Sequence, residues 1–387
     1  MVYNKLVILH TANYSRKIRD FFGVDFLIEK GLDVEFWNCG KITVEEHLSP
    51  VYSDGLKLVD ISSLSDFDKQ IKNRAENQCL YLSYINYAFY SYKMFRVLSN
   101  NNASILCAAA GIMPIQVVEH NSKNRWNRLR IEGISNLIRG RYYSFKLHSK
   151  TFVPMRFLME SCDAARPDYK VSHQTIHLAC NSGDYENYVK SQVYVEKENE
   201  PYAVFIDQYI PYHNDNVLLG KELMSPAKYY GSLNRYFSEF EKTNSCKVII
   251  AAHPSAVRYK DENPYDGRII EYNKSAELVK GSICVLAQFS TAISFAVLGY
   301  KPVTLLTSDE IESKQEHMRI HIQTFKKMLD CDIQNVDNPT RYVPLPVNRD
   351  MYDKYKYTLL TTKQSEGSLN ADVIESIVKD NYYNFIR

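Results

Sequence analysis

Two short polar segments in the C-terminal half carry residues suited to binding a phosphate group. His253 and Pro254 follow one apolar run, and Ser290 and Thr291 open an apolar stretch that ends at Gly299. An imidazole and two hydroxyls can donate hydrogen bonds to phosphate oxygens, and the unpaired amides of a helix N-terminus also favour an anion. The pattern therefore predicts a phosphate site, and we interpret it as part of a nucleotide-sugar site.

Two buried parallel strands are expected to position these segments. The runs 248–250 and 283–286 are apolar and of strand length, which would place His253 and Ser290 side by side at strand carboxyl ends. Open α/β sheets bind ligands at that edge. Pro254 would fix the turn and leave the His253 imidazole facing the ligand. The alternative is a histidine with a purely structural role.

The hydroxyl-rich segment is expected to begin a helix. Ser290, Thr291 and Ser294 precede or enter its apolar face, and Gly299 stands where a C-terminal cap is usual. One hydroxyl would be the N-cap. The others could reach a phosphate, whose charge the helix dipole also favours.

Two carboxylates are candidates for the chemical step. Asp207 ends the apolar run 203–206 and is followed by Gln208, so we expect the acid to point into an interdomain cleft and Gln208 to contact the donor. A turn-capping role for Asp207 is the alternative. Glu132, next to Gly133, is the single acid in a basic stretch, which would keep it ionised and able to take a proton from an acceptor hydroxyl. Its alternative is a surface ion pair.

That basic stretch runs from Lys123 to Lys150 and contains eight Lys or Arg residues interleaved with aromatic ones. Anionic lipid, a phosphorylated acceptor or nucleic acid would each suit such a surface, and a solvated helix face is the alternative. Among its cations, Arg125, Arg128, Arg130 and Lys146 are candidates for a sugar carboxylate or a lipid phosphate.

The 387 residues predict two domains of α/β class. Strands are expected at 6–9, 34–37, 56–61, 79–84 and 104–108, and after a polar linker at 202–206, 247–251, 268–272, 283–287 and 302–306. With helical periods between them, they indicate Rossmann-like domains at 1–190 and 201–370. The remaining segment, 371–387, is expected to contain a helix that crosses back to the first domain.

Composition and residue spacing also bear on where the protein is located and on whether it binds a metal. No stretch approaches the roughly 20 apolar residues of a membrane span, and no signal peptide is evident, which predicts a cytoplasmic protein. The eight cysteines lack the spacing of a zinc site. The Asp-x-Asp pairs at 66–68 and 330–332 lie in polar, amphipathic contexts, so no obligatory metal is expected. The 30 tyrosines suit either sugar-binding surfaces or an AT-rich genome.

The order of His253-Pro254 and Ser290-Thr291 resembles the His-Pro and Ser-Ser/Thr motifs of bacterial GT-B glycosyltransferases that use CMP-activated ulosonic acids, the sialyltransferases and Kdo transferases. The resemblance implies two Rossmann-like domains facing across a cleft, with the donor on the C-terminal domain and the acceptor on the N-terminal one. In those families the two motifs hold the CMP phosphate and ribose, and an Asp/Glu-Gly pair supplies the base. Glu132-Gly133 would be that pair.

The segment ending in Asp207-Gln208 looks more like the retaining β-Kdo transferases of lipopolysaccharide, O-antigen and capsule synthesis. The resemblance implies that Asp207 is the nucleophile of a double displacement and that Glu132 deprotonates the acceptor. Phe295-Ala296 stands where UDP-sugar transferases carry a ribose-binding Glu-Ala pair, which weakens a UDP-hexose interpretation. The alternatives are an inverting sialic- or pseudaminic-acid transferase, a UDP-sugar GT-B enzyme, an epimerase and a nucleotide-sensing scaffold.

The expected function is therefore transfer of a Kdo-like ulosonic acid from CMP to a sugar of a bacterial surface polysaccharide. The partners would be the CMP-sugar donor and a lipid-linked or oligosaccharide acceptor, with no cofactor, no metal and no nucleic acid. Contact between the basic stretch and the inner membrane would place the protein at its cytoplasmic face.

Overall fold

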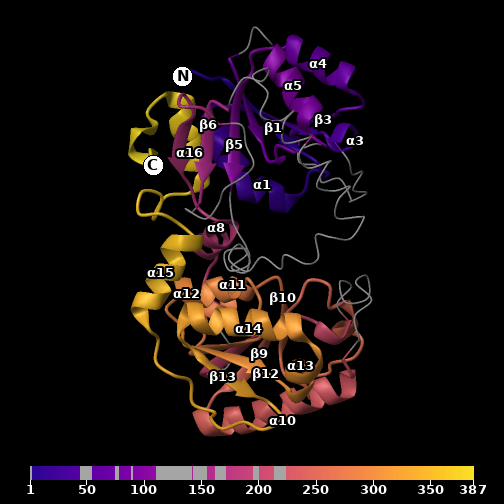
Figure 1. Cartoon of the computed structure of the whole chain (residues 1–387), viewed down its shortest axis with the longest axis vertical. Coiled ribbons are helices and arrows are strands. Elements are labelled where there is room, and N and C mark those ends of the chain that lie inside the picture. The colour runs from indigo at the N-terminus through magenta and orange to yellow at the C-terminus, as the bar shows by residue number, and fades with distance from the viewer. Residues whose placement is uncertain are drawn as a thin grey trace. The chain divides into compact units, whose positions relative to one another are not determined.

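A computed structural model describes residues 2–43, 55–74, 78–88, 90–109, 142, 155–161, 171–194, 200–212 and 224–387 (Figure 1). The described residues form two compact units. The first contains the described residues up to Glu186 together with Thr361–Arg387, and the second is Asn187–Leu360. The C-terminal segment thus belongs to the first unit.

The first unit is built on a parallel sheet with strand order β3-β2-β1-β4-β5-β6-β7. Its strands are β1 (Lys5–His10), β2 (Asp33–Asn38), β3 (Lys57–Asp60), β4 (Cys79–Ser83), β5 (Ser104–Ala109), β6 (Phe157–Glu160) and β7 (Ile176–Ala179). Its described helices are α1 (Arg16–Phe22), α2 (Val24–Glu29), α3 (Gly40–Thr43), α4 (Leu64–Lys72), α5 (Tyr92–Asn100), α16 (Asn370–Lys379) and η4 (Tyr382–Phe385), and α8 (Gly183–Lys190) leads into the second unit.

The second unit has a parallel sheet with strand order β10-β9-β8-β11-β12-β13. Its strands are β8 (Tyr202–Ile206), β9 (Lys247–Ala252), β10 (Ile270–Tyr272), β11 (Cys284–Ala287), β12 (Val303–Thr307) and β13 (Asp332–Asn335). Its helices are η2 (Ile210–Tyr212), α10 (Pro226–Asn244), η3 (Val257–Lys260), α11 (Ser275–Gly281), α12 (Ile293–Leu298), α13 (Asp309–Lys314), α14 (Glu316–Leu329) and α15 (Arg349–Leu359). Both sheets have the Rossmann-like order in which the first strand lies centrally.

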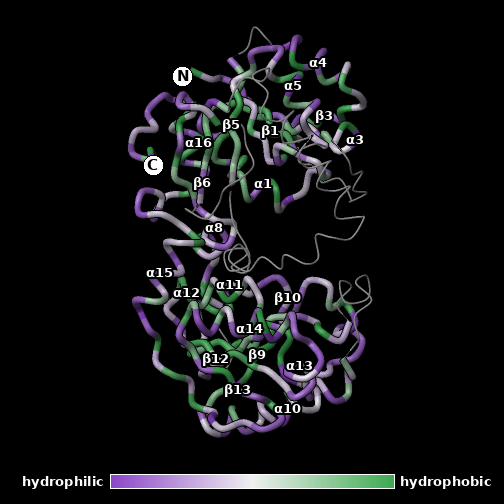
Figure 2. The backbone as a smooth tube through the Cα atoms, in the orientation of Figure 1, coloured by the Kyte–Doolittle hydropathy of each residue, from purple (hydrophilic) through white to green (hydrophobic). Residues whose placement is uncertain are grey.

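Apolar side chains on both faces of each strand explain why these segments form covered parallel sheets. In β1, Leu6 and Ile8 enter one hydrophobic cluster of the first unit, while Val7 and Leu9 enter another. In the second unit, the whole of β8 is buried. Figure 2 shows hydrophobic residues concentrated along the strands of both sheets. Parallel strands covered by helices on both faces require such continuous apolar runs.

The predicted α/β class with two Rossmann-like units is confirmed, and the ten expected strands are present to within a few residues. The sequence analysis did not identify β6, β7 and β13. These are four-residue strands, and β13 carries the polar sequence Asp-Ile-Gln-Asn near the sheet edge. The polar residues of β13 leave no apolar run, whereas β6 and β7 contain apolar residues over too short a stretch to be distinguished from other apolar runs.

Gly299 is the C-cap of α12, as expected from the sequence. Gly299 has a φ of −90°, and Tyr300 takes the left-handed conformation instead, with a φ of 47°. The amide of Lys301 then closes α12 onto the carbonyl of Ala296 at 2.9 Å. A Cβ at position 299 would lie 2.9 Å from the hydroxyl of Tyr188, so a larger residue there would require that side chain to shift.

A buried carboxylate joins three strands of the first sheet. Glu35 in β2 is fully buried and accepts hydrogen bonds from Lys5 at 2.7 Å, Arg74 at 2.9 Å, Trp37 at 3.0 Å and Lys57 at 3.0 Å. Burial alone would raise the pKa of Glu35, but these four donors together lower it to about 2. The ionised carboxylate is therefore the counterion of Arg74, and it shares Lys5 with Asp33.

Replacing Glu35 by glutamine should destabilise the first unit by about 3–5 kcal/mol at pH 7, because the buried Arg74 loses its counterion and Lys5 retains only the exposed Asp33. Both tryptophans of the sequence precede Asn187, so urea unfolding followed by tryptophan fluorescence reports on this unit. The folded pKa of Glu35 lies below its unfolded value of 4.5. The difference between wild type and Glu35→Gln should therefore be fully present above pH 4.5 and shrink between pH 4.5 and 2.

Asp68→Asn is the matched control, since this carboxylate bonds the exposed Lys72 on α4. Loss of the Asp68–Lys72 ion pair should lower the free energy of unfolding by less than about 1 kcal/mol. Equal destabilisation by the two substitutions, or a Glu35→Gln effect that does not vary below pH 4.5, would contradict this account of the network.

Candidate functional site

The carboxyl edge of the second sheet contains most of the expected donor-binding residues. The chain passes from β8 to β9 and β10 on one side and then to β11, β12 and β13 on the other, so the strand order reverses between β8 and β11. At this point the backbone amide of Phe289 donates a 2.9 Å hydrogen bond to the side-chain oxygen of Gln208. Ligands of open α/β sheets bind at such a switch point.

His253 follows β9 on one side of this point. Its Nδ1 accepts a 3.2 Å hydrogen bond from the amide of Ser255, so in the neutral ring the proton lies on Nε2. The imidazole is half-buried, while Pro254 and Ser255 are exposed. His253 therefore offers an N–H donor at the sheet edge.

His253 and Ser290 do not lie side by side as expected. β8 pairs with both β9 and β11, so the turn of Asp207 and Gln208 lies between the two segments. Strands two positions apart are separated by roughly 10 Å. The His-Pro and Ser-Thr turns therefore flank the β8 turn.

The hydroxyl-rich segment forms a turn before the helix begins. α12 starts at Ile293 with Ala292 at the N-cap, and Ser290 Oγ accepts a 3.2 Å hydrogen bond from the amide of Ala292. Ser290 is half-buried and Thr291 is exposed, so both remain near the edge. Because α12 has only six residues, the site depends on hydroxyls more than on a helix dipole.

The expectation that Ser294 contacts the donor needs correction. Ser294 is buried, and its hydroxyl lies 3.3 Å from that of Tyr355 in α15. With α12 beginning at Ile293, this position faces the core of the second unit.

Asp207 is buried, with 2% of its surface exposed, and does not face an open cleft as expected. Oδ1 accepts hydrogen bonds from the amide of Tyr209 and the hydroxyl of Tyr265, and Oδ2 accepts one from the hydroxyl of Tyr259, all at 2.9 Å. Burial raises the pKa of the Asp207 carboxyl, although these donors oppose the rise. The turn-capping alternative matches these contacts, and the role of Asp207 as nucleophile stays a prediction.

The tyrosines around Asp207 form a packed group. The ring of Tyr265 lies 5.5 Å from that of Tyr259 and 5.3 Å from that of Tyr230, and the Tyr230 and Tyr259 hydroxyls are 2.9 Å apart. Burial raises the pKa of each of these three phenols, so they stay neutral donors at physiological pH. The group joins α10, η3 and the segment before β10 to the β8 turn.

A ring cluster beside Ser290 was not identified from the sequence. Phe289 packs its ring 5.4 Å from that of His321 and 6.5 Å from that of His317, both on α14. The sequence does contain two histidines four residues apart, a spacing that places both side chains on one face of a helix. They place two titratable rings next to the hydroxyl turn.

The Asp-x-Asp pairs have protein partners. Ser62 donates to Asp66, Lys72 and Asn101 to Asp68, Asn348 to Asp330, and Gln334 to Asp332. Among the residues that the structure describes, no group of three His, Cys, Asp or Glu side chains is arranged to hold a metal ion. No helix in the described ranges is long and apolar enough to cross a membrane. Glu132 and the basic stretch lie outside these ranges, apart from Tyr142.

Comparison with known proteins shows the fold. No family model and no curated protein matches the sequence. Among solved structures, the wall teichoic acid polymerase TagF matches with a TM-score of 0.50 at 9% identity, over 98% of this chain and 90% of that one. The chain has a GT-B-like fold.

Two further solved structures are similar to a lesser degree. UDP-GlcNAc 2-epimerase from Methanocaldococcus jannaschii gives a TM-score of 0.47 at 10% identity, over 97% of this chain and 99% of that one. The glycosyltransferase SnogD from Streptomyces nogalater gives 0.44 at 9% identity, over 98% and 99%.

The contacts of Asp207 predict a difference between two buried tyrosines. Tyr265→Phe removes a hydrogen bond to a buried carboxylate and should cost about 1.5–3 kcal/mol of unfolding free energy. Tyr236→Phe is the matched control, because the Tyr236 hydroxyl is buried without a hydrogen-bond partner. Its removal should be neutral or stabilising. Urea unfolding followed by circular dichroism measures both, and equal losses would contradict the proposed role of the Asp207 contacts.

Proposed function

We propose that the chain is a glycosyltransferase whose second unit binds a nucleotide-activated sugar at the carboxyl edge of its sheet. The observation that carries this proposal is the switch point between β8 and β11, joined by the Gln208–Phe289 hydrogen bond and flanked by His253 and Ser290. The GT-B-like fold supports it, since the wall teichoic acid polymerase TagF has a similar architecture.

The donor phosphate would lie between the two flanking turns. Their strands are roughly 10 Å apart with the β8 turn between them, so the phosphate would lie over that turn and accept hydrogen bonds of about 3 Å from either side. His253 would donate through Nε2–H, and Ser290 and Thr291 through their hydroxyls. Gln208 would keep the two halves of the site at a fixed spacing.

Within this proposal, the donor is a CMP-activated ulosonic acid. The order of the His-Pro and Ser-Thr motifs supports CMP, as does the absence of a carboxylate at Phe295. That side chain is buried and stacks on Tyr188 with ring centres 6.4 Å apart, so the usual ribose contact of UDP-sugar enzymes has no counterpart there. The acceptor would be a sugar of a bacterial surface polysaccharide, and the reaction would need no metal.

Two stereochemical courses follow from different roles of Asp207. In a double displacement, its carboxylate attacks the anomeric carbon as CMP leaves, and the acceptor oxygen then displaces it while Glu132 takes the hydroxyl proton. Asp207 would first have to give up its bonds from Tyr259 and Tyr265. Its burial favours the second candidate, a single inverting displacement in which Asp207 only positions the β8 turn.

A thermal-shift panel of CMP, CDP, UDP and GDP tests the donor assignment. CMP should raise the melting temperature most, because a ligand at about 100 times its Kd adds about 2.7 kcal/mol to the stability of the folded state. His253→Ala should abolish this shift. His173→Ala, which changes an exposed histidine in the first unit, should preserve it. Stabilisation by UDP alone would overturn the CMP assignment.

Mass spectrometry of the protein incubated with a CMP-ulosonic acid donor distinguishes the two stereochemical courses. A retaining enzyme should yield a glycosyl adduct on the peptide that contains Asp207, and Asp207→Asn should abolish both adduct and turnover. An inverted product, together with turnover that survives in Asp207→Asn, would rule out the double displacement and support the single inverting displacement.

A further inference from the structure

A second carboxylate at the same sheet edge has one oxygen without a partner. Glu310 is the second residue of α13, and its Oε2 atom is buried with no hydrogen-bond partner among the described residues. An unpartnered buried acceptor costs about 1–3 kcal/mol, more when the group is charged. Such an atom indicates a ligand group that donates a hydrogen bond to it.

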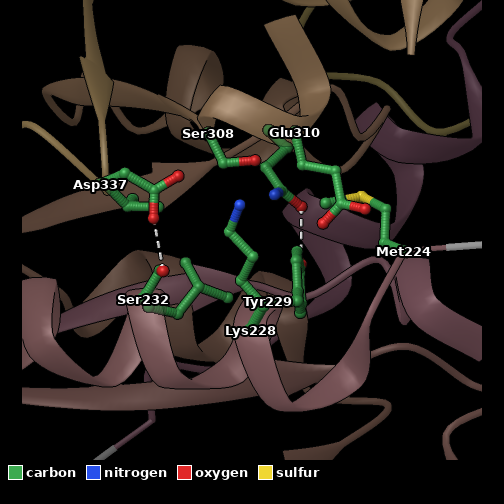
Figure 3. Close-up of a pocket in the computed structure, with 10 residues that line it drawn as sticks. Met224, Lys228, Tyr229, Ser232, Ser308, Glu310 and Asp337 are labelled. Atoms are coloured by element: carbon green, nitrogen blue, oxygen red, sulfur yellow. Dashed lines mark hydrogen bonds between the residues drawn. The ribbon is translucent and has the colours of Figure 1, made fainter. Parts of the chain in front are cut away.

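Glu310 lines a small pocket together with Lys228, Gln288 and Ser308 (Figure 3). Gln288 directly follows β11, and Ser308 directly follows β12, whereas Lys228 comes from the first turns of α10. The pocket therefore lies at the carboxyl edge of the sheet. Since β11 and β12 are paired, it is roughly one strand spacing, about 5 Å, from the strand that leads into Ser290 and Thr291.

The pocket presents both donors and an acceptor. The Gln288 side-chain oxygen accepts a 3.0 Å hydrogen bond from the Tyr229 hydroxyl, so its amide nitrogen is the group that can donate to a ligand. Ser308 Oγ accepts from the amide of Ile311 at 3.2 Å, which leaves its proton to donate. The Glu310 carboxylate can accept a hydrogen bond from a ligand.

This combination fits a hydroxyl group, which donates one hydrogen bond and accepts others. A second carboxylate, Asp337, also lines the pocket, and two acids disfavour a phosphate there. The space is small, so it admits a hydroxyl-sized group and not a base or a sugar ring.

We propose that this pocket receives one hydroxyl of the ribose diol of the donor nucleotide, with Glu310 accepting a hydrogen bond from that hydroxyl. The inference rests on the proposed function, because it requires a nucleotide phosphate at the adjacent turn. Glu310 would thereby supply, from α13, the carboxylate that Phe295 cannot supply from α12.

Calorimetric titration of the full chain with CMP, 2′-deoxy-CMP and 3′-deoxy-CMP tests the proposal. Wild type should bind at least one deoxynucleotide about tenfold or more weakly than CMP, because a charged hydrogen bond is lost. In Glu310→Gln this preference should fall to within about twofold. Glu316→Gln removes an exposed carboxylate nearby on α14 and should retain the full preference.

The outcomes separate the two proposals. If wild type binds CMP but neither deoxynucleotide is disfavoured, or if Glu310→Gln keeps the preference, the ribose pocket is wrong and the donor site stands. If wild type prefers another nucleoside monophosphate, the CMP assignment fails, and the same comparison with its deoxy forms still tests Glu310. If no nucleotide binds, both proposals fail. Lys228→Met serves as a second variant and should also weaken the preference.

Discussion

The burial of the Asp207 carboxylate is the constraint on which the candidate site depends. Removing a carboxylate from water is costly unless hydrogen bonds replace its hydration. Here the replacements come from the β8 turn through the amide of Tyr209, from η3 through Tyr259 and from the segment before β10 through Tyr265. The backbone of His253 also forms a hydrogen bond with Asp207, so satisfying one buried carboxylate also helps to fix the turn that carries the imidazole.

The candidate ligand-binding residues and the candidate nucleophile therefore lie in different environments, which the sequence did not predict. His253, Ser290 and Thr291 lie at the accessible edge and suit a ligand, whereas Asp207 is enclosed by phenols that stay neutral. Several of the numerous tyrosines are explained by this arrangement, since a phenol both fills apolar space and donates to a buried acid. Glu35 plays a comparable part in the first unit, where a buried carboxylate is matched by cations instead of phenols.

The strands that could be predicted from the sequence were those with continuous apolar runs, such as β8 and β9, because a covered parallel sheet imposes that pattern. β13 could not be predicted, since its four residues are mostly polar. In the site, His253 and Gln208 could be placed at strand ends by local sequence alone. The burial of Asp207 could not, because Tyr259 and Tyr265 are 52 and 58 residues away along the chain. Likewise, Ser294 faces the core because α12 begins two residues after Thr291, a boundary that apolar periodicity does not resolve.

The central claim is that the turns after β9 and β11 together hold a nucleotide phosphate. A crystal structure of the chain with bound CMP tests it most directly. We expect the phosphate to lie within hydrogen-bond distance of His253 Nε2 and of the Ser290 or Thr291 hydroxyl, with the Gln208–Phe289 hydrogen bond intact. A nucleotide bound elsewhere, or a phosphate at this edge that contacts neither His253 nor the two hydroxyls, would contradict it.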